Sequence, residues 1–149
     1  MRARSRRPFA GNPNPLQPEE YIFFLDENLH NCQPILDALT SAGLRYERHG
    51  KHFKAGTEDS EWLPVVGMRG WLLLTVDKNI RFNELERRAV EQFGVRAFVF
   101  TSGNLGATQM AAVLVKAFAE MIRLCKRQPA PFIASITKAG GVHLRYPRQ

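Results

Sequence analysis

The sequence predicts an α/β fold in which helices cover both faces of a mostly parallel central sheet, giving a three-layer sandwich. Short apolar runs alternate along the chain with longer segments of helical periodicity. The runs at 21–25 and 71–76 are apolar almost throughout, which is typical of strands buried on both faces of a parallel sheet. Alternating segments of this kind join neighbouring parallel strands by right-handed crossovers.

The elements follow from periodicity and from residues that start or stop helices. Pro34 falls in the first turn of a helix, where its missing N–H is tolerated, and Gly43 is a stop signal. Pro64 lies in the first turns of the next helix, which ends at Gly70. In chain order we expect a strand at 21–25, a helix at 31–42, a strand at 44–47, a helix at 59–69, a strand at 71–76, a helix at 81–93, a strand at 96–100, a helix at 107–126, and strands at 132–137 and 142–146.

The two ends of the chain differ in character. The last two strands flank a turn at 138–141, so we expect a β-hairpin at one edge of the sheet. Residues 1–18 are rich in proline and arginine and predict a disordered arm, which leaves 19–149 as a single domain.

Charge is distributed unevenly along the sequence. Residues 1–18 contain four arginines and no acid, residues 19–95 contain 9 Lys/Arg against 13 Asp/Glu, and residues 96–149 contain 8 Lys/Arg against 1 Glu. The three parts, +4, −4 and +7, sum to the net charge of +7. An acidic segment between basic ones suits a metal site that receives a polyanion, although a solvated basic surface would have the same composition.

Hydropathy and cysteine usage restrict the class of protein. No apolar run is long enough to span a bilayer. Cys32 and Cys125 show no metal-ligand spacing, and each falls in a predicted helix, so we expect buried and reduced thiols. These observations predict a cytoplasmic protein without a membrane partner.

Two apolar strands end in an acidic residue. Asp26 follows the first strand and Asp77 follows the third, and parallel strands present their carboxyl ends at the same edge of a sheet. Two like charges 4 Å apart repel by roughly 4 kcal/mol at an effective dielectric constant of about 20. A divalent metal ion or a shared proton would relieve that repulsion.

A third acidic candidate stands between these strands. Asp59 and Glu61 lie where a loop enters a helix, and acids favour the positive end of the helix dipole. Helix capping by Thr57, Asp59 or Ser60 would explain the same cluster without any functional site.

The loop at 48–54 is basic and contains two histidines. We expect His49 and His52 to contact solvent or phosphate rather than a metal, since flanking lysines disfavour a cation. Trp62 and Trp71 are expected to pack in the core rather than to stack on bases.

Three motifs in this order carry a resemblance to a known family. They are Leu25-Asp26-Glu27-Asn28, Asp59-Ser60-Glu61 and Thr75-Val76-Asp77-Lys78. With them, residues 21–126 resemble the PIN-like nuclease superfamily, especially the small bacterial PIN-like proteins related to VapC-type toxins.

The resemblance implies an endoribonuclease that depends on Mg²⁺ or Mn²⁺ and acts as the toxin of a toxin–antitoxin pair. It assigns Asp26, Asp59 and Asp77 to the metal ion, with Glu61 as a further catalytic residue. The partners that it implies are RNA, an antitoxin protein and a second copy of the chain. Carboxylate-orienting roles fall to Glu27, Asn28, Thr75 and Asn79, and substrate phosphates to Lys51, Lys54, Lys78, Ser102 and Asn104.

A departure from the family, and the order of the residues that follow the strands, leave two alternatives open. Many PIN nucleases carry another acid after the fourth strand, where this chain has Thr101-Ser102-Gly103-Asn104. A catalytically silent module that binds nucleic acid or protein is therefore one alternative. A receiver-like phospho-acceptor domain is the other, with Asp77 as acceptor and Lys138 after the fifth strand, although Lys138 falls in the predicted hairpin turn.

Overall fold

The computed structural model describes residues 21–76, 84–101 and 105–147, and the expected arm at 1–18 lies outside them. The strands and long helices agree with the sequence prediction in type and order. In chain order they are β1 (Ile22–Leu25), α1 (Gln33–Ser41), β2 (Arg45–Arg48), α2 (His49–His52), α3 (Asp59–Arg69), β3 (Leu72–Val76), α4 (Glu84–Phe93), β4 (Arg96–Phe100), α5 (Ala107–Arg127), β5 (Phe132–Ile136) and β6 (Val142–Tyr146).

The strands form one sheet in the order β2-β1-β3-β4-β5-β6, with β1 to β5 parallel and β6 antiparallel to β5. The expected hairpin is therefore present at one edge, and Lys138 is exposed in its turn. Phe24 pairs with Leu73, Leu73 with Ala97 and Ala97 with Ile133, which aligns one apolar row across four strands.

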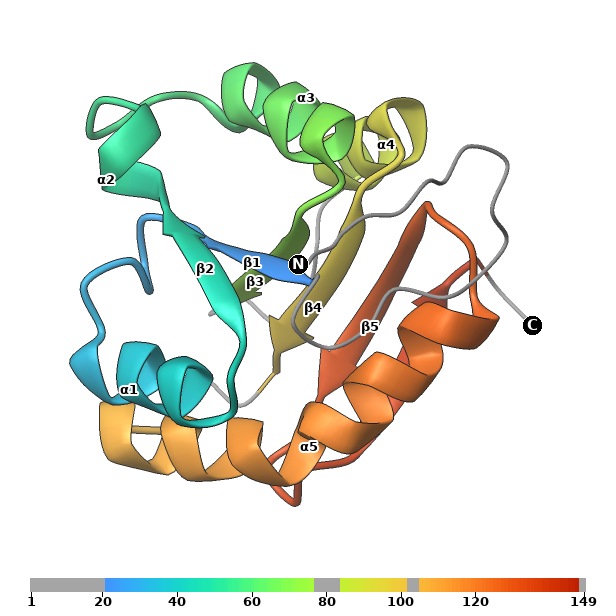
Figure 1. Ribbon diagram of the computed structural model, residues 1–149. Coiled ribbons are helices and arrows are strands. Elements are labelled where there is room, and N and C mark those ends of the chain that lie inside the picture. Colours follow the sequence, from blue (N-terminus) through green and yellow to red (C-terminus); the bar gives the residue numbers. More distant parts are fainter. Residues whose placement is uncertain (1–20, 77–83, 102–104, 148–149) are drawn as a thin grey trace, which may run out of the picture.

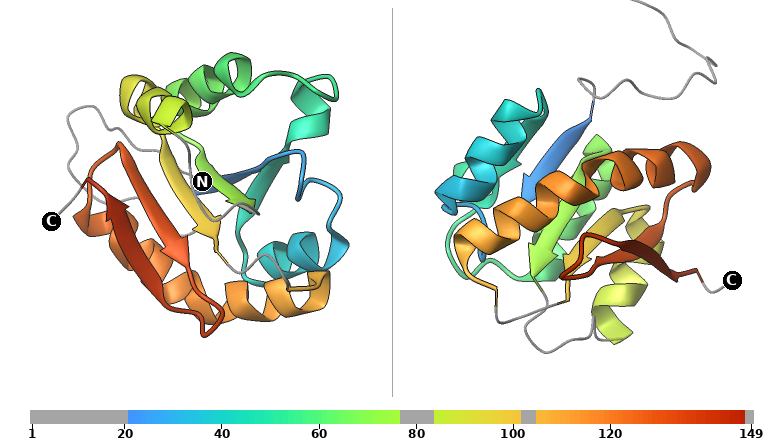
Figure 2. Two further views of the ribbon diagram at one scale, coloured as in Figure 1. Left: turned by 180° about the vertical axis from the view of Figure 1, so that it is seen from behind. Right: turned by 90° about the horizontal axis from the view of Figure 1, so that it is seen from below.

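Helices cover both faces of the sheet, as Figure 1 shows. α1 and α5 lie side by side on one face, whereas α3 and α4 lie together on the other, and the views in Figure 2 agree. Successive strand residues alternate between two buried clusters: Phe23 and Leu25 belong to the α1–α5 layer, and Phe24 to the α3–α4 layer. The predicted three-layer α/β fold with a mostly parallel sheet is confirmed.

A close approach fixes α3 against α4. A Cβ atom at Gly67 would lie 2.0 Å from the carbonyl oxygen of Phe93, the last residue of α4. Only glycine permits this contact. The position of α3 is important for the site, because its first residue is Asp59.

The structure differs from the sequence prediction in the loop at 48–54 and at Cys32, and agrees with it at the two tryptophans. The predicted loop at 48–54 contains the short helix α2, in which the His49 ring turns inward and packs against Phe53 and Trp62. Cys125 is buried as expected, but Cys32 is only half-buried, since it is the N-cap of α1 rather than part of the helix. Trp62 and Trp71 are buried, as predicted.

None of the helices formed by residues 21–76, 84–101 and 105–147 combines the length and the apolar character needed to cross a bilayer.

Candidate active site

The strand order changes direction between β1 and β3. The chain passes from β1 outward to β2, and then returns to β3 on the other side of β1. In open α/β sheets, ligands bind beyond the carboxyl ends of the strands that flank such a point. Asp26 follows β1 directly, and Thr75 is the penultimate residue of β3, so both lie at this edge.

Asp26 is a buried carboxylate, and one hydrogen-bond donor approaches each of its two oxygens. It is 7% exposed, and the Thr75 hydroxyl donates a hydrogen bond to its Oδ2 atom. The backbone N–H of Asn28 donates to Oδ1 at 3.1 Å, which forms an Asx turn. The Asp26 carbonyl oxygen accepts from the N–H groups of Leu29 and His30 at 3.0 and 2.9 Å. Hydrogen bonds therefore hold both the carboxylate and the backbone carbonyl of Asp26.

The electrostatic environment of Asp26 opposes its ionisation. Burial raises the pKa of Asp26 from 3.8 to about 6, because a charged carboxylate loses its hydration there. The hydrogen bonds from Thr75 and Asn28 lower the pKa, whereas the negative charge of Asp59 raises it again. Asp59 is thus close enough for the two carboxylates to interact.

The beginning of α3 does not use its acids or hydroxyls as expected for capping. Glu58 is the N-cap residue, and its side chain makes no capping hydrogen bond. The Thr57 hydroxyl instead donates to the carbonyl oxygen of Lys54 at 2.6 Å. The expected side-chain cap by Thr57, Asp59 or Ser60 is therefore absent, whereas Asp59 and Glu61 do lie in the first turn, where the helix dipole favours acids. Glu61 is exposed in the first turn.

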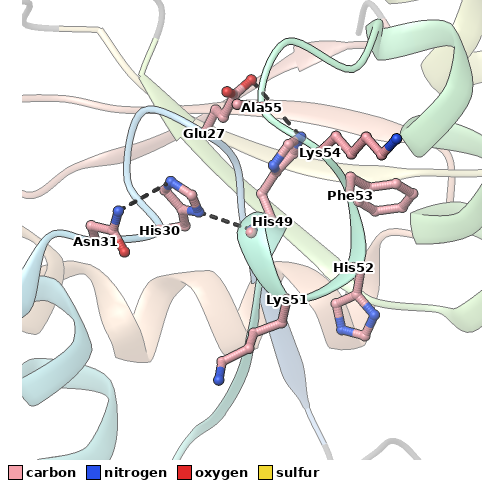
Figure 3. Close-up of a pocket in the computed structure, with 10 residues that line it drawn as sticks. Glu27, His30, Asn31, His49, Lys51, His52, Phe53, Lys54 and Ala55 are labelled. Atoms are coloured by element: carbon pink, nitrogen blue, oxygen red, sulfur yellow. Dashed lines mark hydrogen bonds and ion pairs between the residues drawn. The ribbon is translucent and has the colours of Figure 1, made fainter.

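Glu27 joins three segments of the chain. Its Oε2 atom accepts a hydrogen bond from the Gly56 N–H at 2.9 Å, and its Oε1 atom lies 4.0 Å from His49 Nε2. Figure 3 shows the His49 ring directed at the Glu27 carboxylate. His30, from the same turn as Glu27, also contacts α2, where its Nδ1 accepts the Gly50 N–H at 2.9 Å.

His49 is the residue that sequence reasoning placed wrongly. It is 0% exposed rather than solvent-facing, because its ring packs among the rings of Phe24, Phe53 and Trp62. Burial lowers the pKa of His49, against the opposing effects of Glu27 and Asp59. Among the residues that the structure describes, neither ring nitrogen has a hydrogen-bond partner. The spacing of four between His49 and Phe53 was the available signal for an inward helical face.

An open groove of about 660 Å³ lies beside this cluster, between the turn after β1 and the segment around α2 (Figure 3). Lys51 and Lys54 contribute exposed cationic side chains to its lining. His52 also lines the groove and pairs with Glu47 at 2.7 Å. The groove therefore combines positive charge with direct access to Glu27, the neighbour of Asp26.

The described part of the predicted site fits a hard divalent cation. Each Asp26 oxygen accepts one hydrogen bond from the protein and keeps a further lone pair, and carboxylate oxygens are ligands that Mg²⁺ and Mn²⁺ prefer. Within 21–76, 84–101 and 105–147, no three histidine, cysteine or acidic groups are arranged to hold a metal. The predicted residues outside these ranges are Asp77, Lys78, Asn79, Ser102 and Asn104.

Comparisons with known proteins agree with this architecture. Residues 22–102 match the family model described as "PIN like domain". The chain is also 32% identical over 117 residues to "Putative ribonuclease VapC45" of Mycobacterium tuberculosis (strain ATCC 25618 / H37Rv), a match that covers 76% of this chain and 83% of that protein. No solved structure matches the chain.

Proposed function

The chain belongs to the PIN-like domain family, and on that basis we propose that it is a ribonuclease that uses Mg²⁺ or Mn²⁺ to hydrolyse phosphodiester bonds. One observation carries the proposal: the buried Asp26 carboxylate, held by Thr75 at the point where the strand order reverses. Burial disfavours the charge of this carboxylate, and the partners that the structure gives its two oxygens, Thr75 and the Asn28 N–H, are neutral. A cation bound there would offset that penalty.

The proposed ligands are Asp26, Asp59 and Asp77. When bound, the metal ion would polarise a phosphate oxygen and lower the pKa of the attacking water. The residues of this chain supply the rest: Thr75 and the Asn28 N–H keep the two Asp26 oxygens in fixed directions. Such outer contacts commonly tune metal affinity by 10–100-fold. We place Glu61 beside the reacting phosphate, and Asn79 among the orienting residues.

The groove beside α2 supplies the proposed path of the RNA backbone. Segment 19–95 has a net charge of −4, so cations must outweigh its repulsion of a polyanion. Lys51 and Lys54 line the groove and are exposed, which suits contacts with phosphates on one side of Asp26. We assign further phosphate contacts to Lys78, Ser102 and Asn104.

A toxin role would give the protein further partners. The relative in Mycobacterium tuberculosis carries a VapC name, and we propose that this chain likewise acts as a toxin in the cytoplasm. Its partners would then be RNA, an antitoxin protein and a second copy of the chain. Co-expression with the product of a neighbouring gene, followed by co-purification, tests the antitoxin directly.

Cleavage of labelled single-stranded RNA tests the proposed function. The full chain should cleave with Mn²⁺ or Mg²⁺, stop cleaving when EDTA is added, and lose activity in Asp26→Asn. A catalytically silent module would bind the same RNA without cleaving it. No observation favours the receiver-like alternative, since the exposed turn that contains Lys138 belongs to the β5–β6 hairpin.

A further inference from the structure

We propose that His49 is a positioning residue that holds the Glu27 carboxylate, and that Glu27 in turn fixes the loop leading into α3 so that Asp59 faces Asp26. The inference rests on the proposed function, because the site that it orders is the proposed metal site. Sequence reasoning had assigned His49 to solvent or phosphate, and neither the family match nor the relative's name gives it a role.

Glu27 has two oxygens with two different neighbours. Oε2 accepts the Gly56 N–H at 2.9 Å, and Oε1 faces His49 Nε2 at 4.0 Å. Glu27 directly follows Asp26, and Gly56 stands three residues before Asp59. The position of this one carboxylate therefore affects both proposed ligands at once. The Glu27 side chain is 39% exposed, so it needs a second contact to stay in a single orientation.

His49 is suited to provide that second contact. Its ring is anchored on several sides by Phe24, Phe53 and Trp62, so the imidazole has little freedom to move. Both ring nitrogens are buried without a hydrogen-bond partner among the described residues, which is costly unless a polar group approaches. The Glu27 carboxylate is at 4.0 Å, about 1 Å beyond a direct hydrogen bond. A small movement of Glu27 would therefore complete the contact.

The competing explanation is that His49 only fills space in the aromatic cluster. An apolar ring would fill the same space without two unpartnered nitrogens, so the two explanations predict opposite results for His49→Phe. If His49 only packs, the variant should be unchanged at Glu27 and at the metal site. If His49 positions Glu27, the variant should remain as stable or become more stable, while the site becomes less ordered.

The experiment measures two quantities separately in the full chain: the order of the loop around Gly56, and the affinity of the site for Mn²⁺. Hydrogen exchange of the Gly56 amide, followed by NMR, reports on its bond to Glu27 without any metal or RNA. Mn²⁺ alone, titrated with detection by electron paramagnetic resonance, reports on the site. In His49→Phe we expect roughly tenfold faster Gly56 exchange and roughly tenfold weaker Mn²⁺ binding, in line with other outer contacts of metal sites, at an unchanged or higher melting temperature.

Variants of Glu27 test whether the effect of His49 on the site passes through the Glu27 carboxylate. Glu27→Ala should reproduce both effects, whereas Glu27→Gln should preserve most of the slow Gly56 exchange, because its amide oxygen can still accept that N–H. The double variant His49→Phe/Glu27→Ala should be no worse than Glu27→Ala alone, since both residues act in one chain of contacts. The matched control is His52→Phe, a histidine on the same helix that pairs with Glu47 instead and should leave both readouts unchanged.

Wild-type Gly56 exchange and wild-type Mn²⁺ affinity in a folded His49→Phe would overturn the proposal. Failure to fold would also overturn it if His49→Leu, which needs less space, fails as well, because His49 would then be essential for packing. If the wild type neither binds Mn²⁺ nor cleaves RNA, the proposed nuclease function is wrong. The Gly56 exchange rate then decides alone whether His49 holds Glu27.

Discussion

Asp26 and His49 are buried polar side chains at the same edge of the sheet, on either side of the turn that follows β1, yet their surroundings differ. The Asp26 carboxylate accepts hydrogen bonds from Thr75 and Asn28. The His49 ring is enclosed by aromatic rings, and neither of its nitrogens has a hydrogen-bond partner among the described residues. Asp26 accepts a hydrogen bond at each oxygen, but its surroundings disfavour its charge. His49 is neutral, but neither of its nitrogens is hydrogen-bonded.

The difference shows how one sheet edge can hold a charged site at a limited cost in folding free energy. Asp26 keeps its charge near neutral pH because donors in the turn after β1 and on β3 offset part of the burial penalty. The pKa of His49 is lowered by burial, so the ring adds no charge that would compete with a cation at Asp26. We therefore expect substitutions at Asp26 to change the rate of catalysis strongly. Substitutions around His49 should instead change how well the neighbouring loop is ordered.

The largest expected effect is the loss of catalysis in Asp26→Asn. The asparagine is nearly isosteric and can still bond to Thr75, but it removes the charge that would bind the metal ion. Loss of a metal contribution of several kcal/mol corresponds to about a thousandfold lower cleavage rate. Single-turnover cleavage of a labelled RNA in Mn²⁺ measures it, and retention of even a tenth of the wild-type rate would exclude Asp26 from the site.

The second effect concerns stability and pH. The pKa of Asp26 is raised from 3.8 to about 6 in the folded protein, so the folded state binds its proton more tightly than the unfolded chain. The resulting stability is complete below pH 3.8 and is lost as pH rises through about 6. Two pKa units correspond to roughly 3 kcal/mol.

Asp26→Asn lacks this pH-dependent contribution. Its stability relative to wild type should therefore rise by roughly 3 kcal/mol between pH 3.8 and 6 and then level off. Urea denaturation in EDTA at several pH values measures the difference. A constant difference across that range would show that Asp26 ionises normally.

A smaller effect is expected for Thr75→Val, which preserves the β-branched shape but removes the hydroxyl that donates to Asp26. Loss of a hydrogen bond to a charged group should cost roughly 2 kcal/mol at pH 7.5. The cost should fall at pH 5, where Asp26 is mostly protonated. Denaturation at the two pH values tests this, and an equal cost at both would separate Thr75 from the Asp26 charge.

The smallest effect should come from the region near His49. A Cβ at Gly50 would lie 2.8 Å from the His30 ring, but that ring is the movable end of a half-buried side chain. In Gly50→Ala the ring should swing away and the bond to the Gly50 N–H should break, with the better helix propensity of alanine as compensation. Stability should stay within about 0.5 kcal/mol of wild type in urea denaturation. A larger loss would show that the bond between His30 and the Gly50 N–H is important for the fold.

The fold was predictable because its signals are local. Continuous apolar runs such as Leu72–Val76 and stop signals such as Gly70 identify buried strands and helix ends without tertiary information. The position of Asp26 at a strand end was also predictable, since it needs only the end of one apolar run. Its hydrogen bond from Thr75 was expected only as a general orienting role, because Thr75 lies 49 residues away.

The residues that were misread depend on packing between distant segments. His49 looked exposed because its immediate neighbours are basic, but its environment is set by Phe24 and Trp62, which come from β1 and α3. Likewise, threonine is a residue type that often caps helices, yet the Thr57 hydroxyl donates back to the carbonyl oxygen of Lys54. For Thr57, no local sequence pattern distinguishes this outcome from a helix cap.

The central claim is that Asp26 belongs to a divalent-metal site at the carboxyl edge of the sheet. An anomalous difference map from a crystal soaked in Mn²⁺ tests it most directly. The account predicts one strong peak within bonding distance of an Asp26 carboxylate oxygen, with Asp59 on its other side. Full Mn²⁺-dependent cleavage by the same preparation, with no peak near Asp26 or with a peak bound elsewhere, would contradict it.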